Sequence, residues 1–397
     1  MEWFVDQLRQ VLRPHAGWYG FIAAVGLTVI GIMAIDTVQP HYAVSQAQRW
    51  LPIALVAMVA CLLPRPRMIG ENAYLVAGVT VILMLLLIVP GLPRSIVPVI
   101  NGARRWIDFQ FILFQPSELA KIAFVLALAW YLRYRSNYRT FRGLLVPFLI
   151  TMLPVALLLK QPDLGTAMVF VPTLCVMMVA AGAKLRHLSS LIAIGVVVAG
   201  VNVAIVAYDA PPWMRLLKPH QEARIAAMLW PERHRDRAGY QQQVAINIVS
   251  SGGVAGVGGP RSSTLLRFNH LPENHNDMVF AVIINRWGLI GGVAVMGLYI
   301  VLVSSFFLVA ARSKDPFARL VCVGFGGLIF VQATINIAVT VGLAPITGIT
   351  LPFISYGGSS LVMAFVMVGL MLNFACRRPM MMARPSFEFD RAKTAAE

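Results

Sequence analysis

The chain has 397 residues, of which 58% are apolar and 13% are charged, and its mean hydropathy is +0.73. This composition excludes an ordinary soluble globular protein. The 33 lysines and arginines outnumber the 17 aspartates and glutamates. They form short clusters between apolar runs and no basic and aromatic stripe, so nucleic acid is not expected as a partner.

Apolar runs recur along the chain at about 17 to 25 residues, the length that an α-helix needs to cross a bilayer. The sequence therefore predicts an all-α polytopic membrane protein, with a single bundle of ten transmembrane helices in residues 1–376. The first run is too long for the core of a secretory signal and is expected to be the first span. The predicted spans are 17–35, 48–63, 73–90, 118–132, 144–159, 165–182, 188–208, 279–311, 318–343 and 356–375.

The positions of the basic residues predict the orientation. With both termini in the cytoplasm, the cytoplasmic segments carry 18 lysines and arginines, and the short loops on the other side carry five. The positive-inside rule therefore places both termini in the cytoplasm and makes 377–397 a basic cytoplasmic tail. It also places 209–277, a large loop between spans 7 and 8, on the outer face. Within this loop, 221–231 has the apolar spacing of a short amphipathic helix suited to the membrane surface.

The loop before the fourth span carries the first candidate site on the outer face. In NGARRWIDFQFILFQPSELAK, 101–121, Pro116 and Glu118 fit the start of a helix, and Glu118 and Lys121 share one face of it. Ionisable groups at the edge of a span are costly and usually functional. An ion pair that only steadies the helix is an equally good interpretation.

Two further segments carry candidate residues with ordinary structural alternatives. Asp163 in KQPDLG stands where a helix begins, and an N-cap would explain it. The stretch PITGITLPFISYGGSS, 345–360, interrupts the start of a span with prolines and glycines. It indicates either a simple kink or backbone that lines a binding site. Ser359 and Ser360 have no identifiable His or Asp partner that would make either a nucleophile.

The end of the long outer loop contains two acidic residues and two histidines. The histidines, His270 and His275, match no firm zinc spacing beside Glu273. Asp277 directly precedes an apolar run, where either a helix cap or a general base would explain it. The glycine-rich run 250–259 lacks the signature of a P-loop, and we expect a turn or a re-entrant segment there.

Six motifs in this order resemble the SEDS family (shape, elongation, division and sporulation), which is typified by RodA and FtsW. The resemblance covers nearly the whole chain, and 218–232 is more similar to the elongation branch, RodA, than to the division branch. The motifs are NGARRWID at 101–108, QPSELAK at 115–121, QPDLGTA at 161–167, GYQQQVAINIVSSGG at 239–253, LPENHNDMVFAVI at 271–283 and LAPITGITLPFISYGGSS at 343–360.

The resemblance implies a peptidoglycan glycosyltransferase of the bacterial cytoplasmic (inner) membrane, which polymerises lipid II during cell elongation and shape maintenance. It implies a class B penicillin-binding protein, a transpeptidase, as partner, besides membrane lipid. No cofactor is certain, and a divalent cation such as Mg²⁺ is left open. The catalytic residues implied are Asp277, as general base, with Glu118 and Lys121, and the substrate-binding residues are Arg104, Arg105, Trp106, Asp163, Glu273 and Ser359. Of these, Arg104, Arg105 and Lys121 also suit a diphosphate by their charge alone.

The chain departs from the family pattern at several positions. Asn285 and Arg286 replace a usual Glu-Glu pair, and this change of local charge is expected to affect metal use or the choice of acceptor. Asn276 replaces a usual threonine, and Val244 and Val257 replace usual serine and lysine positions. A catalytically altered scaffold for a transpeptidase is therefore an alternative function. A flippase for the lipid-linked precursor is another alternative, because broken spans and charges at membrane depth are also features of transporters.

Overall fold

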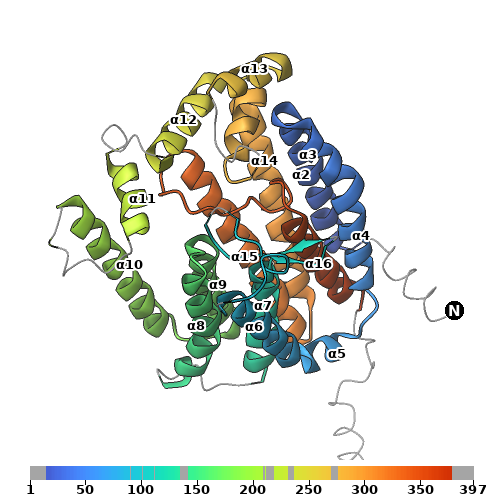
Figure 1. The fold of residues 1–397 in the computed structure, drawn as a ribbon. Coiled ribbons are helices and arrows are strands. Elements are labelled where there is room, and N and C mark those ends of the chain that lie inside the picture. The colour runs from blue at the N-terminus through green and yellow to red at the C-terminus, as the bar shows by residue number, and fades with distance from the viewer. Residues whose placement is uncertain are drawn as a thin grey trace, which may run out of the picture.

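The structure is a computed structural model, and it describes residues 15–89, 91–100, 102–110, 112–134, 142–208, 211, 219–230, 237–269 and 276–377. Each of the ten predicted spans coincides with a helix of a tightly packed bundle (Figure 1). The elements are α2 Gly17–Val38, α3 Pro40–Ser45, the π-helix η1 Gln46–Trp50, α4 Leu51–Ala60, α5 Pro66–Glu71, α6 Ala73–Ile88, β1 Ile107–Asp108, β2 Leu113–Phe114, α7 Pro116–Leu132, the short 3₁₀-helix η3 Arg142–Leu144, α8 Leu145–Lys160, α9 Leu164–Ala181, α10 Leu185–Ala207, α11 Pro219–Leu229, α12 Arg237–Gly252, α13 Gly259–Asn269, α14 Val279–Arg312, α15 Pro316–Thr340 and α16 Gly358–Cys376.

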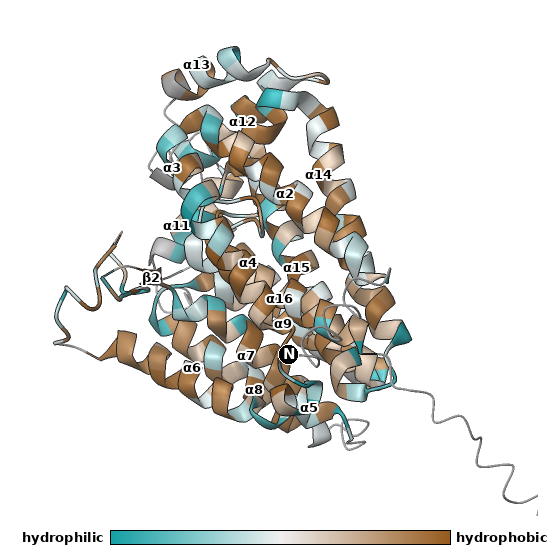
Figure 2. Cartoon of the chain, turned by 90° about the vertical axis from the view of Figure 1, so that its right-hand side faces the viewer, coloured by the Kyte–Doolittle hydropathy of each residue, from teal (hydrophilic) through white to brown (hydrophobic). Residues whose placement is uncertain are grey.

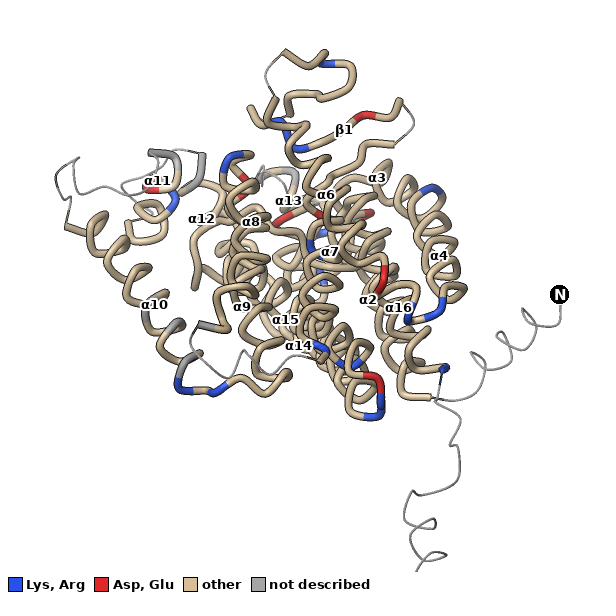
Figure 3. The backbone as a smooth tube through the Cα atoms, turned by 90° about the horizontal axis from the view of Figure 1, so that it is seen from below, with Lys and Arg blue, Asp and Glu red and all other residues tan. Residues whose placement is uncertain are grey.

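The helices have the length and composition expected of a membrane protein. Six of them, α2, α9, α10, α14, α15 and α16, have segments long and apolar enough to cross a membrane, and α6 and α8 are shorter apolar helices. Apolar residues cover α6 and α14, whereas polar residues are more frequent on α3, α11 and α13 (Figure 2). Charged residues lie mostly near helix ends and in connections (Figure 3). The predicted all-α membrane fold is confirmed, and the count of ten spans remains a prediction.

The centre of the bundle is formed by α14, α15 and α16. Helix α14 packs against α2 and α15, α15 packs also against α7 and α9, and α16 packs against α4. The buried side chains of these helices form one continuous apolar core. Helix α10, in contrast, lies at the edge of the bundle, where it contacts α9 and α11 and exposes most of its described side chains.

Helix α14 is not the single continuous span that the sequence predicts for 279–311. Gly288 has φ 71° and ψ −168°, which divides α14 into a short helix before it and a long helix after it. Only glycine adopts this backbone region readily. A Cβ atom at Gly288 would also lie 2.2 Å from the carbonyl oxygen of Val254. The break therefore requires a glycine on two independent grounds.

The glycine-rich run stabilises this break by exchanging hydrogen bonds with it. The amides of Leu289 and Ile290 donate to the carbonyls of Gly253 and Val254, at 2.9 and 3.3 Å. In return, the amides of Val257 and Gly258 donate to the carbonyls of residues 285 and 286, at 2.9 and 3.2 Å. In an unbroken helix these carbonyls and amides would bond to each other. Within the run 250–259, residues 253–258 thus form a turn between α12 and α13, one of the two forms predicted for the run.

A small hairpin between α6 and α7 was not predicted. Strands β1 and β2 pair antiparallel, with Ile107 opposite Phe114. Ser359, at the start of α16, donates to the carbonyl of Leu113 at 3.0 Å and accepts from the amide of Gln115 at 3.2 Å. These contacts join the hairpin and the start of α7 to the start of α16.

Candidate functional site

The site is built around Asp277, which lies just before α14 and is partly buried. The N-cap position of α14 is Met278, and no side chain caps the helix there. The alternative interpretation of Asp277 as an N-cap is therefore not supported. Asn336, on α15, holds the segment in place, because its side-chain amide donates to the carbonyls of Asp277 at 2.9 Å and of Ile349 at 2.6 Å.

The connection between α15 and α16 passes directly beside the Asp277 carboxylate. A Cβ atom at Gly348 would lie 3.5 Å from Oδ2 of Asp277, and the φ of Gly348 is 74°. A glycine at this position lets the backbone turn next to the carboxylate. The interrupted stretch 345–360 is therefore the backbone beside the candidate base, and residues up to Gly357 are non-helical, as the prolines and glycines predict.

Arg224 of α11 brings a positive charge to this site, and sequence reasoning missed it. Its Nη1 atom donates to the carbonyl of Ile346 at 3.1 Å. Burial lowers the pKa of Arg224, as does the nearby Arg105, whereas Asp277 and Asp163 raise it. Arg105, Asp163 and Asp277 thus all lie within electrostatic range of Arg224. We call these four residues the outer charge cluster. The predicted helix at 221–231 is confirmed, but it packs against α10 and α12 and turns Arg224 toward the bundle.

The two remaining members of the outer charge cluster are fixed by neighbouring segments. Arg105 donates from Nε to the carbonyl of Gln161 at 3.2 Å, and also to the carbonyl of Pro162. Asp163 is 3% exposed and caps α9, accepting from the amide of Thr166 at 3.2 Å and from its hydroxyl at 2.9 Å. The capping interpretation of Asp163 therefore holds, while its charge still acts on Arg224.

Lys121 and Glu118 form a buried ion pair on α7, with 2.8 Å between Nζ and Oε2. The Lys121 ammonium also donates to Oε1 of Gln332 at 3.1 Å, and the amide of Gln332 donates to the carbonyl of Thr350 at 2.9 Å. Lys121 is 3% exposed. Lys121 is thus buried with two acceptors, and one of them, Gln332, binds the backbone of Thr350. We infer that Lys121 stabilises the connection between α15 and α16.

The other predicted site residues lie elsewhere or outside the described residues. Arg104 donates to the carbonyl of Val89 at 3.4 Å, just past the end of α6, where a cation suits the helix dipole. Trp106 is partly buried beside β1. Ser359 is used in joining the hairpin to α16. Glu273 lies outside the described residues.

The positions that depart from the family pattern have structural partners. Asn285 is fully buried and donates to the Ser251 hydroxyl at 2.7 Å. Arg286 donates to the carbonyl of Met33 at 2.6 Å and to the hydroxyl of Thr37, at the end of α2. Both residues therefore hold the broken part of α14 against its neighbours. This placement gives no support to the expected effect on metal use or acceptor choice.

The described residues contain no group of three or more His, Cys, Asp or Glu side chains that could hold a metal ion. The outer charge cluster holds the Asp277 carboxylate within electrostatic range of the Arg224 guanidinium, which suits proton transfer next to an anionic group.

Fold and site together define a polytopic helical membrane protein with a charged site where its loops converge. The four residues of the outer charge cluster lie just before β1, at the start of α9, on α11 and just before α14. The family profile FTSW_RODA_SPOVE, described as "Cell cycle protein", matches residues 8–379, and the chain belongs to this family. The family that the six motifs predict is thus confirmed.

Named relatives cover most of the chain. A "Probable peptidoglycan glycosyltransferase FtsW" of Coxiella burnetii is 34% identical over 299 residues, which are 74% of this chain and 76% of the relative. The "Peptidoglycan glycosyltransferase RodA" of Treponema pallidum is 29% identical over 343 residues, 70% of this chain and 78% of the relative. Both relatives are named as peptidoglycan glycosyltransferases, which is the predicted enzyme class. One bears the name of the division branch, FtsW, and the other that of the elongation branch, RodA.

Solved structures agree with the fold. A chain described under "Structural coordination of polymerization and crosslinking by a peptidoglycan synthase complex" has a TM-score of 0.73 and 31% identity, with 89% of this chain and 96% of that chain covered. The rod shape determining protein RodA of Thermus thermophilus has a TM-score of 0.65 and 28% identity, with 90% and 95% covered.

Proposed function

We propose that this protein is a peptidoglycan glycosyltransferase that polymerises lipid II, a disaccharide-pentapeptide on undecaprenyl diphosphate. The observation that carries the proposal is the position of Asp277, a partly buried carboxylate that lies close to the backbone at Gly348 and within electrostatic range of Arg224. Glycosyl transfer from a diphosphate needs a base for the acceptor hydroxyl and cations for the leaving group. The outer charge cluster contains both kinds of group.

In the proposed reaction Asp277 is the general base. It takes the proton of an acceptor sugar hydroxyl, whose oxygen forms a bond to the anomeric carbon of the donor. The bond from that carbon to the diphosphate oxygen breaks, and undecaprenyl diphosphate leaves with the electron pair. The configuration at the anomeric carbon inverts, so that the base and the leaving group lie on opposite faces of the sugar, as in inverting glycosidases.

The departing diphosphate would bind Arg105 and Arg224. A guanidinium group matches phosphate oxygens in a bidentate manner, and burial strengthens the attraction because it removes competing water. The positive charge of Arg105 and burial both disfavour the charged form of Arg224. An anion placed between these two cations would relieve that repulsion. Each hydrogen bond that they make in the structure goes to a backbone carbonyl, which leaves further guanidinium donors for a ligand.

Lys121 is then a positioning residue instead of a direct phosphate ligand. Through Gln332 it holds Thr350, two residues beyond Gly348, whose backbone passes close to the base. Glu118 neutralises the Lys121 ammonium, which would otherwise be a costly buried charge. We retain Arg104, Trp106, Glu273 and Ser359 as neighbours of the substrate path, with Ser359 acting through its contacts to the hairpin.

The location and partners belong to the same proposal. Both termini lie in the cytoplasm of a bacterium, the outer charge cluster faces outward from the inner membrane, and a class B penicillin-binding protein acts as transpeptidase partner. One neighbour in structure belongs to a peptidoglycan synthase complex, which supports a partner of this kind. The elongation role rests on the RodA-like sequence at 218–232.

The test is polymerisation of purified lipid II by the purified protein and its Asp277→Asn variant. No side chain caps α14, and Asn336 binds the backbone of residue 277, so we expect the variant to fold and to bind lipid II. Loss of a general base lowers the rate by about 10² to 10⁴. Asp36→Asn is the matched control, because Asp36 is an exposed carboxylate near the end of α2, and its polymerisation should stay at the wild-type rate.

Polymerisation by Asp277→Asn at the wild-type rate would remove this residue from the mechanism. If no variant and no wild-type protein made glycan strands, while labelled lipid II crossed vesicles that contain the protein, the flippase would replace the enzyme. A wild-type protein active only with its transpeptidase partner would still support the enzyme, provided that Asp277→Asn abolishes this activity.

A further inference from the structure

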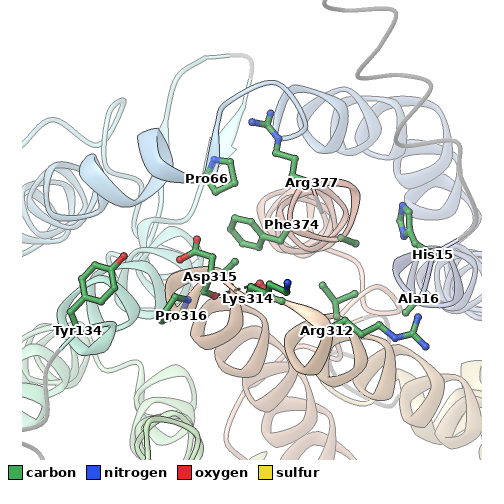
Figure 4. A pocket seen from close by; sticks show the side chains of 14 residues that line it. His15, Ala16, Pro66, Tyr134, Arg312, Lys314, Asp315, Pro316, Phe374 and Arg377 are labelled. Carbon is green, nitrogen blue, oxygen red and sulfur yellow. Dashed lines mark hydrogen bonds between the residues drawn. The ribbon is translucent and has the colours of Figure 1, made fainter. Parts of the chain in front are cut away.

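A second site lies at the predicted cytoplasmic end of the bundle, away from the outer charge cluster. A cavity of about 880 Å³ opens there between the ends of α14 and α16 and the start of α15 (Figure 4). Its lining comes from segments far apart in the sequence, including residues 15–16, Pro66 and Tyr134. All of these segments were predicted to be cytoplasmic, and their convergence in one place supports that grouping.

The lining is mainly basic where it is charged. Arg312 at the end of α14, Lys314 in the connection to α15 and Arg377 just after α16 contribute three cations. Asp315 contributes the single carboxylate among the described lining residues. The Asp315 carboxylate is already engaged, because it caps α15 by accepting from the amide of Phe317 at 3.1 Å. At neutral pH the cavity therefore carries an excess of positive charge, even with His15 uncharged.

Two of the three cations are available to a ligand. Within the described part of the chain, the side chains of Arg312 and Lys314 make no hydrogen bond or ion pair, and both residues are exposed. Arg377 is held at the cavity by the carbonyls of Leu62 and Leu63, to which it donates at 3.2 and 3.1 Å. Burial and the nearby Arg65 lower the pKa of Arg377, so an anion would be favourable beside it.

Most of the remaining lining residues are apolar. Val309, Ala318, Phe374 and Ala375 form a hydrocarbon wall next to these cations, and Figure 4 shows Phe374 between Arg377 and Lys314. The helices that frame the wall, α14, α15 and α16, are all long and apolar enough to cross a membrane. The cavity therefore lies where the ends of membrane-spanning helices meet water, and it offers cations and hydrocarbon side by side.

We propose that this cavity binds the phosphodiester headgroup of an anionic membrane phospholipid, with part of an acyl chain against the apolar wall. Basic pockets between transmembrane helices on the cytoplasmic side bind lipids of this kind. Arg312 and Arg377 suit the phosphate oxygens by their planar guanidinium groups, and Lys314 adds a mobile charge. The volume is within the range of sites for small ligands. The proposal is independent of glycosyl transfer, since it concerns the other end of the bundle.

The test is a titration of the full-length protein, purified in a neutral detergent and freed of lipid, with short-chain phosphatidylglycerol, phosphatidylcholine or glycerol phosphate. Isothermal calorimetry gives the affinity for each. We expect saturable binding of phosphatidylglycerol, and binding at least about tenfold weaker for both phosphatidylcholine and glycerol phosphate. Phosphatidylcholine lacks the net negative charge, and glycerol phosphate lacks the acyl chains.

A double variant, Arg312→Gln with Lys314→Gln, should bind phosphatidylglycerol at least about tenfold more weakly than wild type, because two charged partners of the phosphate are lost. The matched control is Lys184→Gln with Arg186→Gln. These are exposed cations at the start of α10 that do not line the cavity, and this variant should keep wild-type affinity. Size-exclusion chromatography shows whether each variant remains folded.

Three results would overturn the proposal. Equal affinity for glycerol phosphate would make the site one for a soluble anion. Equal affinity for phosphatidylcholine would mean that the cavity does not recognise the net negative charge of the headgroup. An equal loss in the double variant and in its control would mean that lipid is attracted by the total charge of this end and not by the cavity.

Discussion

Replacement of Gly288 by alanine tests whether the break in α14 supports the site. The backbone region that Gly288 occupies costs a residue with a Cβ atom about 1 to 3 kcal/mol. The new Cβ atom would also lie 2.2 Å from the Val254 oxygen and 2.4 Å from the Gly256 nitrogen. Both are backbone atoms, so they cannot move aside as a flexible side chain would. We therefore expect the four exchanged hydrogen bonds to be weakened by at least about 2 kcal/mol in all.

Hydrogen–deuterium exchange measures this loss directly, in peptides that contain the amides of residues 257, 258, 289 and 290. A loss of about 2 to 3 kcal/mol raises the exchange rate of these amides by roughly 30- to 150-fold, since each 1.4 kcal/mol is a factor of ten. Polymerisation should fall as well, because Asp277 directly precedes the short helix before the break. Gly297→Ala is the control, as nothing lies within 4 Å of a Cβ atom there, and alanine favours a helix. Unchanged exchange at these amides in Gly288→Ala would refute the reasoning.

Three further predictions concern the site and the orientation. Lys121→Met should leave the affinity for lipid II within about threefold of wild type and should lower the turnover number. The reason is that Lys121 positions the connection between α15 and α16 through Gln332. An affinity loss of tenfold or more, measured by direct binding, would make Lys121 a phosphate ligand instead. Arg224→Gln should weaken lipid II binding by about ten- to a hundredfold in the same assay, since a charge-assisted contact is worth about 1.5 to 3 kcal/mol, and unchanged affinity would remove Arg224 from the diphosphate site. Single cysteines at positions 232 and 385 of a cysteine-free protein should react with an impermeant reagent in intact cells only at 232, and the reverse pattern would contradict the orientation.

Much of the helical pattern could be predicted because it is a local property. An apolar run of sufficient length defines a membrane helix wherever its neighbours lie, and every predicted span falls on a helix. The ion pair of Glu118 and Lys121 was equally accessible, since residues three apart share a helix face. The prolines and glycines of 345–360 predicted the non-helical connection for the same reason.

What escaped prediction depends on distant partners. Gly288 departs from the helix because a run some thirty residues earlier exchanges hydrogen bonds with it, and one glycine in a helical pattern gives no such signal. Arg224 looked like part of the polar face of an amphipathic helix. Only the contact with Ile346 shows that this face meets protein. Asn336 and Gln332, both inside an apolar run, were the available signal for a polar network near Asp277, because buried amides need partners.

The break at Gly288 also changes the direction of the segment that carries the candidate base, relative to the long part of α14. The short helix before the break contacts α12 through Asn285 and α2 through Arg286. The side chains of Phe280 and Ile284 lie near Gly292, on the long part of α14. Three helices therefore fix the short helix jointly, and a change in the position of any one of them would be transmitted to Asp277.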